Sequence, residues 1–196
     1  MKKFELTDEF ITDIFGNKLF RIKALVDFGT IRAGELGGFA EKEENLSNDG
    51  NAWVYGDAWV SGNARVYGDA WVSGNARVYG DARVSGNARV YGNAWVSGNA
   101  WVSGNAWVSG NACVSGNADY AVIEGFGRYF RATTFFRCND KTLRVQCGCF
   151  YGDLAQFREI VKKTHGDSKY AKEYLAIADL MELHFSDEEG RQEAAE

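Results

Sequence analysis

The chain has 196 residues, 22 basic and 27 acidic side chains, a formal net charge of −5, 23 glycines and no proline. This length suits one to three small modules, and the 6 Trp, 9 Tyr and 13 Phe exclude a disordered chain. No apolar run is long enough to span a membrane, and mild acidity argues against nucleic-acid binding by the whole chain. Without an apolar signal segment, the four cysteines are expected to be reduced thiols in a cytoplasmic protein that holds no cofactor.

The first 49 residues are expected to form a β cap and an irregular first coil. Two apolar runs flank Gly16-Asn17 in the stretch FITDIFGNKLFRIKALVDF, which is typical of a β-hairpin. The next stretch, GTIRAGELGGF, predicts the irregular coil. An acidic cluster at 41–44 is interpreted as a solvated loop.

Residues 50–121 form an array of six-residue repeats that begins GNAWVY, GDAWVS, GNARVY. Eleven hexads run without interruption to residue 115, and a decayed twelfth begins at Gly116. A fixed short period indicates a solenoid. Side chains alternate across a strand, so the invariant Ala and Val should face a narrow core and the variable Trp/Arg and Tyr/Ser should face outward. Gly followed by Asn or Asp would form each corner.

The array resembles the left-handed parallel β-helix of hexapeptide-repeat proteins. In that family an aliphatic residue follows a small residue two positions earlier, as Val54 follows Ala52 here. The resemblance implies three hexads in each coil and a left-handed crossover. Residues 18 positions apart would then stack, and columns of Asn at the corners could hydrogen-bond along the array.

Stacking predicts columns of outward side chains, and all six Trp occupy outward positions. The candidate partner or oligomer surface comprises Trp53, Trp71, Arg89 and Trp107 on one face and Trp59, Arg77 and Trp95 on a second. The third column reads Arg65, Arg83, Trp101. Exposed clusters of large aromatics mark contact surfaces, so a homo-oligomer (trimer or dimer) is expected. The alternative is that Trp and Arg simply stack as pairs on a flat face.

Residues 122–196 predict a separate α+β module. RYFRATTFFRC and TLRVQCGCF should form two antiparallel strands joined by 139–141. Two helices should follow, one capped by Asp153 and ended by Gly166, the other begun by Asp167 or Ser168, before a frayed tail from Ser186. The predicted fold class is therefore mainly β, a left-handed parallel β-helix with an N-terminal β-hairpin cap and a C-terminal α+β cap.

A candidate anion-binding face lies on the two C-terminal strands. Alternation along the strands is expected to place on one face Arg131, Arg137, Arg144 and Gln146. Forked guanidinium donors on a rigid sheet could hold a phosphate or carboxylate. The alternative is a solvated face that pairs with acidic residues of the second helix.

The cysteines offer a weaker metal hypothesis. A site could combine Cys138, Cys147 and Cys149 with His165. The C-x-C spacing departs from the pairs usual in structural zinc sites. Alternation instead predicts core-facing thiols that share one core with the first strand, so no metal is expected.

The layout of N-terminal cap, GNAxV array and a C-terminal FFRC…CGCF…HGDSKYA segment resembles uncharacterised hexapeptide-repeat proteins of bacteria and their phages. The leading hypothesis is a non-catalytic binding or scaffold protein, in the phage case an accessory protein that binds or sequesters a host factor such as a defence protein or signalling nucleotide. Its ligand would be a host protein or an anionic small molecule. One alternative is an acyltransferase-like enzyme that uses His165 with Arg131 or Arg144, although the repeats hold no histidine and no catalytic motif is recognisable. Another is a structural filament or virion component.

Overall fold

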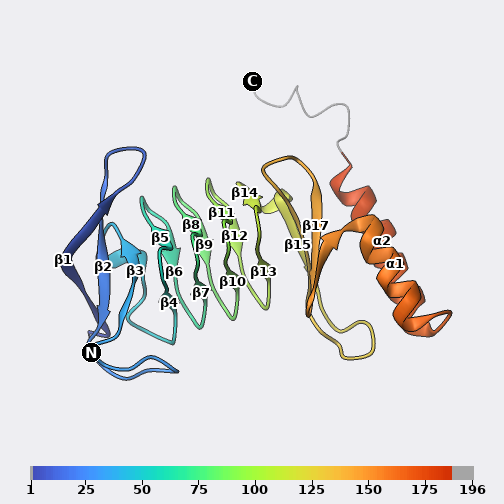
Figure 1. The fold of residues 1–196 in the computed structure, drawn as a ribbon, viewed down its shortest axis with the longest axis horizontal. Coiled ribbons are helices and arrows are strands. Elements are labelled where there is room, and N and C mark those ends of the chain that lie inside the picture. Colours follow the sequence, from blue (N-terminus) through green and yellow to red (C-terminus); the bar gives the residue numbers. More distant parts are fainter. Residues whose placement is uncertain (1, 187–196) are drawn as a thin grey trace.

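The computed structural model describes residues 2–186. A β-hairpin, a stack of coils and an α+β module follow one another along the long axis of the molecule (Figure 1). The predicted mainly β fold is confirmed. Apart from Ser186, the predicted frayed tail lies outside the described residues.

The N-terminal strands extend one sheet of the solenoid. Strands β1 (Phe4–Thr12) and β2 (Lys18–Ala24) form the expected antiparallel hairpin, and β3 (Leu36–Ala40) pairs antiparallel with β2. On its other side β3 pairs parallel with β5 (Trp59–Val60) of the coils. The hairpin is therefore continuous with the solenoid.

Polar side chains of the N-terminal cap close the first coil. Lys3 Nζ donates to the carbonyl oxygen of Ala52 at 2.9 Å. Asn45, which ends the short 3-10 helix η1 (Glu43–Asn45), donates from Nδ2 to the carbonyl oxygen of Ala64 at 2.9 Å. Backbone groups that a bare solenoid end would expose are thus paired.

The coils contain two-residue strands in three parallel sheets. The remaining strands are β4 (Trp53–Val54), β6 (Arg65–Val66), β7 (Trp71–Val72), β8 (Arg77–Val78), β9 (Arg83–Val84), β10 (Arg89–Val90), β11 (Trp95–Val96), β12 (Trp101–Val102), β13 (Trp107–Val108) and β14 (Cys113–Val114). Their orders are β4-β7-β10-β13, β6-β9-β12 and β5-β8-β11-β14. Arg89 pairs with Trp71 and Trp107, which confirms the 18-residue coil.

The interior and the corners of the coils follow the sequence prediction. The Ala and Val of every hexad from 50 to 115 are buried. The corner glycines of these hexads have positive φ, as at Gly86 (+65°). Side-chain amides form the expected ladders: Asn75 Nδ2 donates to Asn93 Oδ1 at 3.2 Å, and Asn87 Nδ2 donates to Asn105 Oδ1 at 3.1 Å. A narrow apolar core and polar corner columns therefore run the length of the array.

The C-terminal module is a four-stranded antiparallel sheet followed by two helices. The sheet order is β15 (Tyr120–Ile123), β16 (Thr133–Arg137), β17 (Leu143–Cys147), β18 (Phe150–Asp153), and the helices are α1 (Leu154–His165) and α2 (Lys169–Phe185). Asp153 and Ser168 cap the helices as predicted. Sequence analysis missed β15 and β18, and the decayed twelfth hexad forms the 3-10 helix η2 (Asn117–Asp119). Between residues 2 and 186, no helix has the length and apolar character that crossing a membrane requires.

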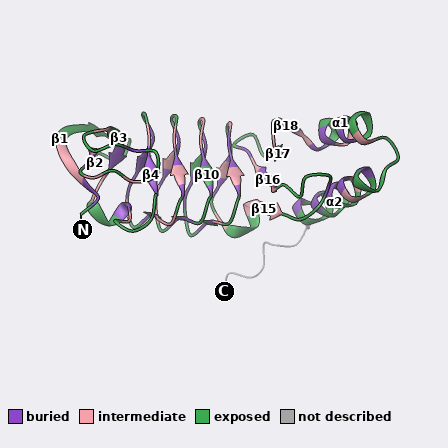
Figure 2. Ribbon diagram, turned by 90° about the horizontal axis from the view of Figure 1, so that it is seen from below, coloured by how far each residue is buried: buried purple, intermediate pink, exposed green. Residues whose placement is uncertain are grey.

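Both faces of this sheet are covered, one by the end of the solenoid and the other by the helices (Figure 2). Phe136 and Cys138 join the solenoid core, whereas Phe135 and Val145 pack with the helices. The prediction that the cysteines and apolar residues of both strands share one core is therefore wrong. The sheet lies between two cores, so its apolar residues alternate between them.

Trp53 and Trp59 are buried, contrary to the prediction that every repeat Trp is exposed. Trp53 is fully covered and packs against Phe4 and Phe28, at ring-centroid distances of 6.5 and 5.3 Å. Trp59 packs with Leu19 and Phe39 and is 7% exposed. Both point outward from the coil, but the N-terminal cap covers them. They cannot belong to a free partner surface.

Candidate ligand-binding site

A pocket of about 500 Å³ lies where the solenoid meets the C-terminal module. We call it the junction pocket; its walls include Arg89, Trp107, Tyr129, Phe130, Arg131 and Gln146. Arg89 and Trp107 belong to a predicted Trp/Arg column, whereas Arg131 and Gln146 belong to the predicted anion face. The fold therefore brings together residues that the sequence assigned to two separate sites.

Rings on the neighbouring coils hold the Arg89 side chain in place. Its guanidinium carbon lies 5.6 Å from the Trp71 ring centroid and 5.2 Å from that of Trp107. Arg77 is held in the same way on the second face, 5.7 Å from Trp59 and 5.0 Å from Trp95. The predicted Trp–Arg stacking is therefore present. A guanidinium between two rings can still present N–H donors to a ligand.

The loop 124–132, between β15 and β16, forms the opposite wall of the pocket. Glu124 accepts a hydrogen bond of 2.9 Å from Asn105 Nδ2, which ties the loop to a corner of the solenoid. Tyr129 and Phe130 are 61% and 69% exposed. The guanidinium carbon of Arg131 lies 4.9 Å from the Tyr129 ring centroid. The loop thus presents two aromatic rings and a second guanidinium to the pocket.

Phe130 has a strained backbone. Its φ is +52°, a region that bulky residues rarely adopt and that costs about 1–3 kcal/mol. Burial gives no compensation because most of the ring faces solvent. Such strain at an exposed ring beside a pocket is typical of functional loops.

Gln146 joins the solenoid to the C-terminal sheet. Its Oε1 accepts hydrogen bonds from the hydroxyls of Tyr91 at 3.2 Å and Ser109 at 3.1 Å. Its Nε2 donates to the carbonyl oxygen of Gly148 at 2.7 Å. These contacts occupy the side chain, so Gln146 positions the pocket rather than offering a free anion donor.

The predicted anion face does not exist as one surface. Arg144 pairs across the sheet with Phe136 and lies on the solenoid side, 3.7 Å from the Asp153 carboxylate. Arg137 lies one position beyond Phe136 and therefore points to the opposite side, where it donates to the carbonyl oxygen of Phe185 at 2.8 Å. Of the four predicted residues, Arg131 and Gln146 line the junction pocket, and Arg137 and Arg144 do not.

The cysteines of the metal hypothesis also lie apart from one another. Cys138 packs in the solenoid core, Cys147 contacts the helical core and Cys149 is exposed in the β17–β18 turn. Burial and the nearby Asp140 raise the pKa of the Cys138 thiol, which disfavours the thiolate that binds metals. Within residues 2–186, no three His, Cys, Asp or Glu side chains form a metal-binding group.

His165 lies at the end of α1 and packs against Tyr174 at a ring-centroid distance of 5.8 Å. It does not line the junction pocket. Asp153, the partner of Arg144, caps the other end of α1, roughly 18 Å away at the rise of an α-helix. Arg144 and His165 therefore do not share a site.

The junction pocket combines positive charge with aromatic surface. Arg89 and Arg131 supply two positive charges against one carboxylate, Glu124, which Asn105 already holds. Guanidinium groups provide paired donors for oxyanions, and the rings of Trp107, Tyr129 and Phe130 provide flat apolar surfaces. The lining holds no histidine, cysteine or lysine.

The parallel coils with an 18-residue period define a β-solenoid repeat protein. Within the array, residues 58–74, 70–86, 82–98 and 94–110 match the family described as the YdcK beta solenoid repeat. This similarity includes the coils that carry Arg89 and Trp107 but not the loop 124–132 or the C-terminal sheet. A comparison with curated proteins found no match.

Proposed function

We propose that this protein is a non-catalytic binding protein that holds a planar, anionic small molecule in the junction pocket. The observation that carries the proposal is the convergence of Arg89 and Arg131, from different modules, on one pocket with three aromatic side chains. The two guanidinium groups would bind the ligand's oxyanion, and the rings would stack on its flat part.

The surroundings of the pocket favour binding without a large conformational change. Trp71 and Trp107 restrict Arg89 from both sides, and Gln146 links the sheet to the solenoid through Tyr91 and Ser109. Side chains that are ordered before the ligand arrives lose less entropy on binding. The solenoid would therefore act as a rigid support for one wall of the site.

The resemblance to hexapeptide-repeat proteins of bacteria and phages adds a biological setting to this proposal. In that setting the protein would be a cytoplasmic, left-handed β-helix that assembles as a homo-oligomer and sequesters a host factor, such as a signalling nucleotide. A filament is the less favoured arrangement, because side chains of the N-terminal cap pair with the first coil and β16 covers the last coils. Covered ends offer no strands for end-to-end stacking.

Native mass spectrometry of protein purified gently from expressing cells tests the proposal directly. We expect a discrete oligomer with extra bound mass, which identifies the ligand. The same measurement on Arg131→Gln should show the added mass lost. Arg77→Gln is the matched control, because Arg77 is stacked like Arg89 but lies outside the junction pocket.

If no added mass is present, calorimetric titration with adenosine 5′-monophosphate provides the second test, with adenosine and inorganic phosphate as partial probes. We expect the monophosphate to bind more tightly than either part, and Arg131→Gln to weaken it about tenfold or more, since charge-assisted hydrogen bonds contribute about 1.5–3 kcal/mol. Equal binding by the wild-type protein and Arg131→Gln, or no binding of any probe, would contradict the proposal.

A further inference from the structure

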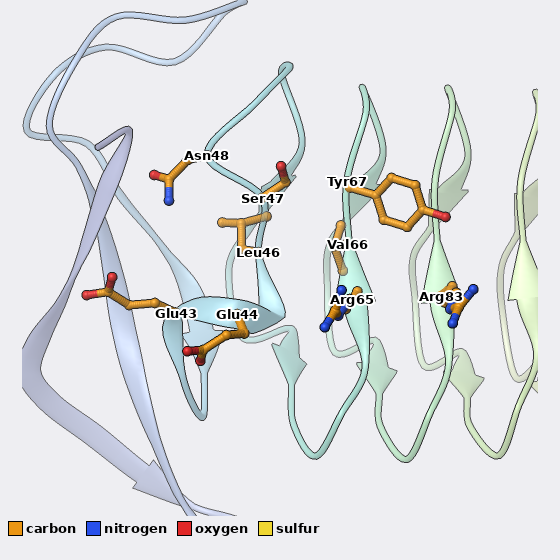
Figure 3. A pocket seen from close by; sticks show the side chains of 9 residues that line it. All are labelled: Glu43, Glu44, Leu46, Ser47, Asn48, Arg65, Val66, Tyr67 and Arg83. Atoms are coloured by element: carbon orange, nitrogen blue, oxygen red, sulfur yellow. The ribbon is translucent and has the colours of Figure 1, made fainter. Parts of the chain in front are cut away.

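A second pocket lies on the third face of the solenoid, beside the N-terminal cap, and has a volume of about 690 Å³ (Figure 3). Arg65 and Arg83 lie side by side on successive coils, and Tyr67, Ser47 and Asn48 contribute further hydrogen-bonding groups to the lining. We call it the arginine-pair pocket. It shares no lining residue with the junction pocket.

The arrangement of arginines differs here from that on the other two faces. Arg77 and Arg89 each lie between two Trp rings. Arg65 instead pairs directly with Arg83, and only Arg83 has a ring beside it, that of Trp101 at 5.8 Å. Strands in a sheet are about 4.8 Å apart, so two like charges lie on neighbouring strands and repel each other, although solvent screens part of this repulsion because both side chains are exposed.

The protein supplies little compensation of its own. Neither guanidinium forms an ion pair or side-chain hydrogen bond with any residue between 2 and 186. Glu43 is already 2.6 Å from Lys2 Nζ. Of the lining carboxylates, this leaves Glu44 to balance the charge of two arginines. Both glutamates lie on the side of the N-terminal cap (Figure 3).

We propose that the arginine-pair pocket is a second ligand site that binds an oxyanion, either a phosphate or a carboxylate group. The anion would lie over Arg65 and Arg83 and accept forked hydrogen bonds from both, with donors from the Tyr67 and Ser47 hydroxyls. Its charge would remove the repulsion between the stacked guanidiniums. The site is independent of the junction pocket.

Calorimetric titration at low ionic strength tests the proposal, with sodium phosphate and sodium acetate as separate probes that distinguish the two oxyanions. Arg131→Gln serves as the parent protein, so that binding at the junction pocket is weakened and the signal of the arginine-pair pocket can be resolved. We expect saturable binding of at least one probe, weakened about tenfold or more by adding Arg65→Gln and reduced by added salt. Adding Arg77→Gln instead should leave the affinity unchanged. Equal binding with and without Arg65→Gln, an equal loss with Arg77→Gln, or no saturable binding would overturn the proposal.

Thermal unfolding in the absence of anions provides an independent test. Arg65→Gln removes one of two adjacent like charges, so its unfolding temperature should equal or exceed that of the parent protein. When the anion that binds is added, the unfolding temperature of the parent protein should rise, and that of Arg65→Gln should not change. A lower unfolding temperature for Arg65→Gln without anion would make Arg65 a structural residue and contradict the proposed role.

Discussion

The hydroxyl of Tyr91 donates a hydrogen bond of 3.2 Å to Oε1 of Gln146, joining residues 55 positions apart. Ser109 donates to the same oxygen at 3.1 Å. One amide therefore links two coils of the solenoid to the C-terminal sheet and sets the position of the junction pocket.

Gln146→Leu should destabilise the junction between the solenoid and the sheet. The substitution conserves approximate volume but leaves the Tyr91 and Ser109 hydroxyls without this acceptor in a mostly buried interface, at a cost of about 1–3 kcal/mol. Tyr91→Phe is the milder control because it removes a single donor, at about 1 kcal/mol. Denaturant unfolding measures both, and equal stability of Gln146→Leu and the wild-type protein would show that the contact contributes nothing.

Phe130→Asn should separate stability from binding. Asn tolerates positive φ better than Phe, so the free energy of unfolding should stay constant or rise by about 1 kcal/mol. Loss of the exposed ring should weaken a ligand bound in the junction pocket. Thermal unfolding and ligand titration on the same samples measure the two effects; a clear loss of stability would show that the Phe130 ring supports the fold.

Lys3 should make the stability of the N-terminal cap depend on pH. Burial lowers the pKa of Lys3 from 10.5 to about 8, although Asp49 and Asp69 oppose the shift. Between these two values the unfolded chain binds more protons than the folded chain, so the contribution of Lys3 to stability rises as the pH increases from 8 to 10.5. Denaturant unfolding should therefore show that the free energy of unfolding of the wild-type protein rises relative to that of Lys3→Met as the pH increases over this interval.

Ionisation of tyrosine lowers stability as the pH rises, but it affects the wild-type protein and Lys3→Met equally. Burial, with Cys147 nearby, raises the pKa of Tyr174 to about 12, so its contribution is lost as the pH rises from 10 towards 12. A difference between wild type and Lys3→Met that stays constant with pH would contradict the assignment to Lys3.

Two corner glycines form a matched pair for testing the coil stack. Gly86 and Gly104 have similar positive φ values, +65° and +67°. A Cβ at Gly86 would lie 3.0 Å from the backbone nitrogen of Gly104, whereas a Cβ at Gly104 would meet nothing closer than Glu124 Oε1 at 3.7 Å. Both alanine variants should lose about 1–2 kcal/mol from the left-handed backbone, and Gly86→Ala should lose more because the next coil must move. Equal losses in denaturant unfolding would show that the coils separate easily.

Periodicity made much of the fold predictable. The invariant Ala and Val identified the core, and the corner glycines followed from the same repeat. The 18-residue register was implied by the resemblance to hexapeptide-repeat proteins and is confirmed. The N-caps of α1 and α2 were also predictable, because Asp153 and Ser168 form local hydrogen bonds with the first turns of their own helices. The short strands β15 and β18 were missed because neither has a regular alternation of its own.

The candidate site was only partly predictable. Arg89, Trp107, Arg131 and Gln146 were all identified as candidates, but in two unrelated sets. Tyr129 and Phe130 were missed as site residues, because the prediction placed both in the first C-terminal strand, whereas they are exposed in the loop that precedes β16. The positive φ of Phe130 is a property of the folded backbone and could not be read from the chain.

The sequence by itself determined the repeating coil, its Ala/Val core and its outward Trp and Arg columns, because these depend on alternation and on contacts between equivalent positions. Only the tertiary structure decided which outward residues stay accessible. The N-terminal cap buries Trp53 and Trp59, and the C-terminal sheet docks both of its faces, which places Arg131 beside Arg89 and separates Arg137 from Arg144. The physical reason is that docking depends on the combined shape and polarity of surfaces far apart in the chain. Local sequence patterns do not predict which of these surfaces pack together.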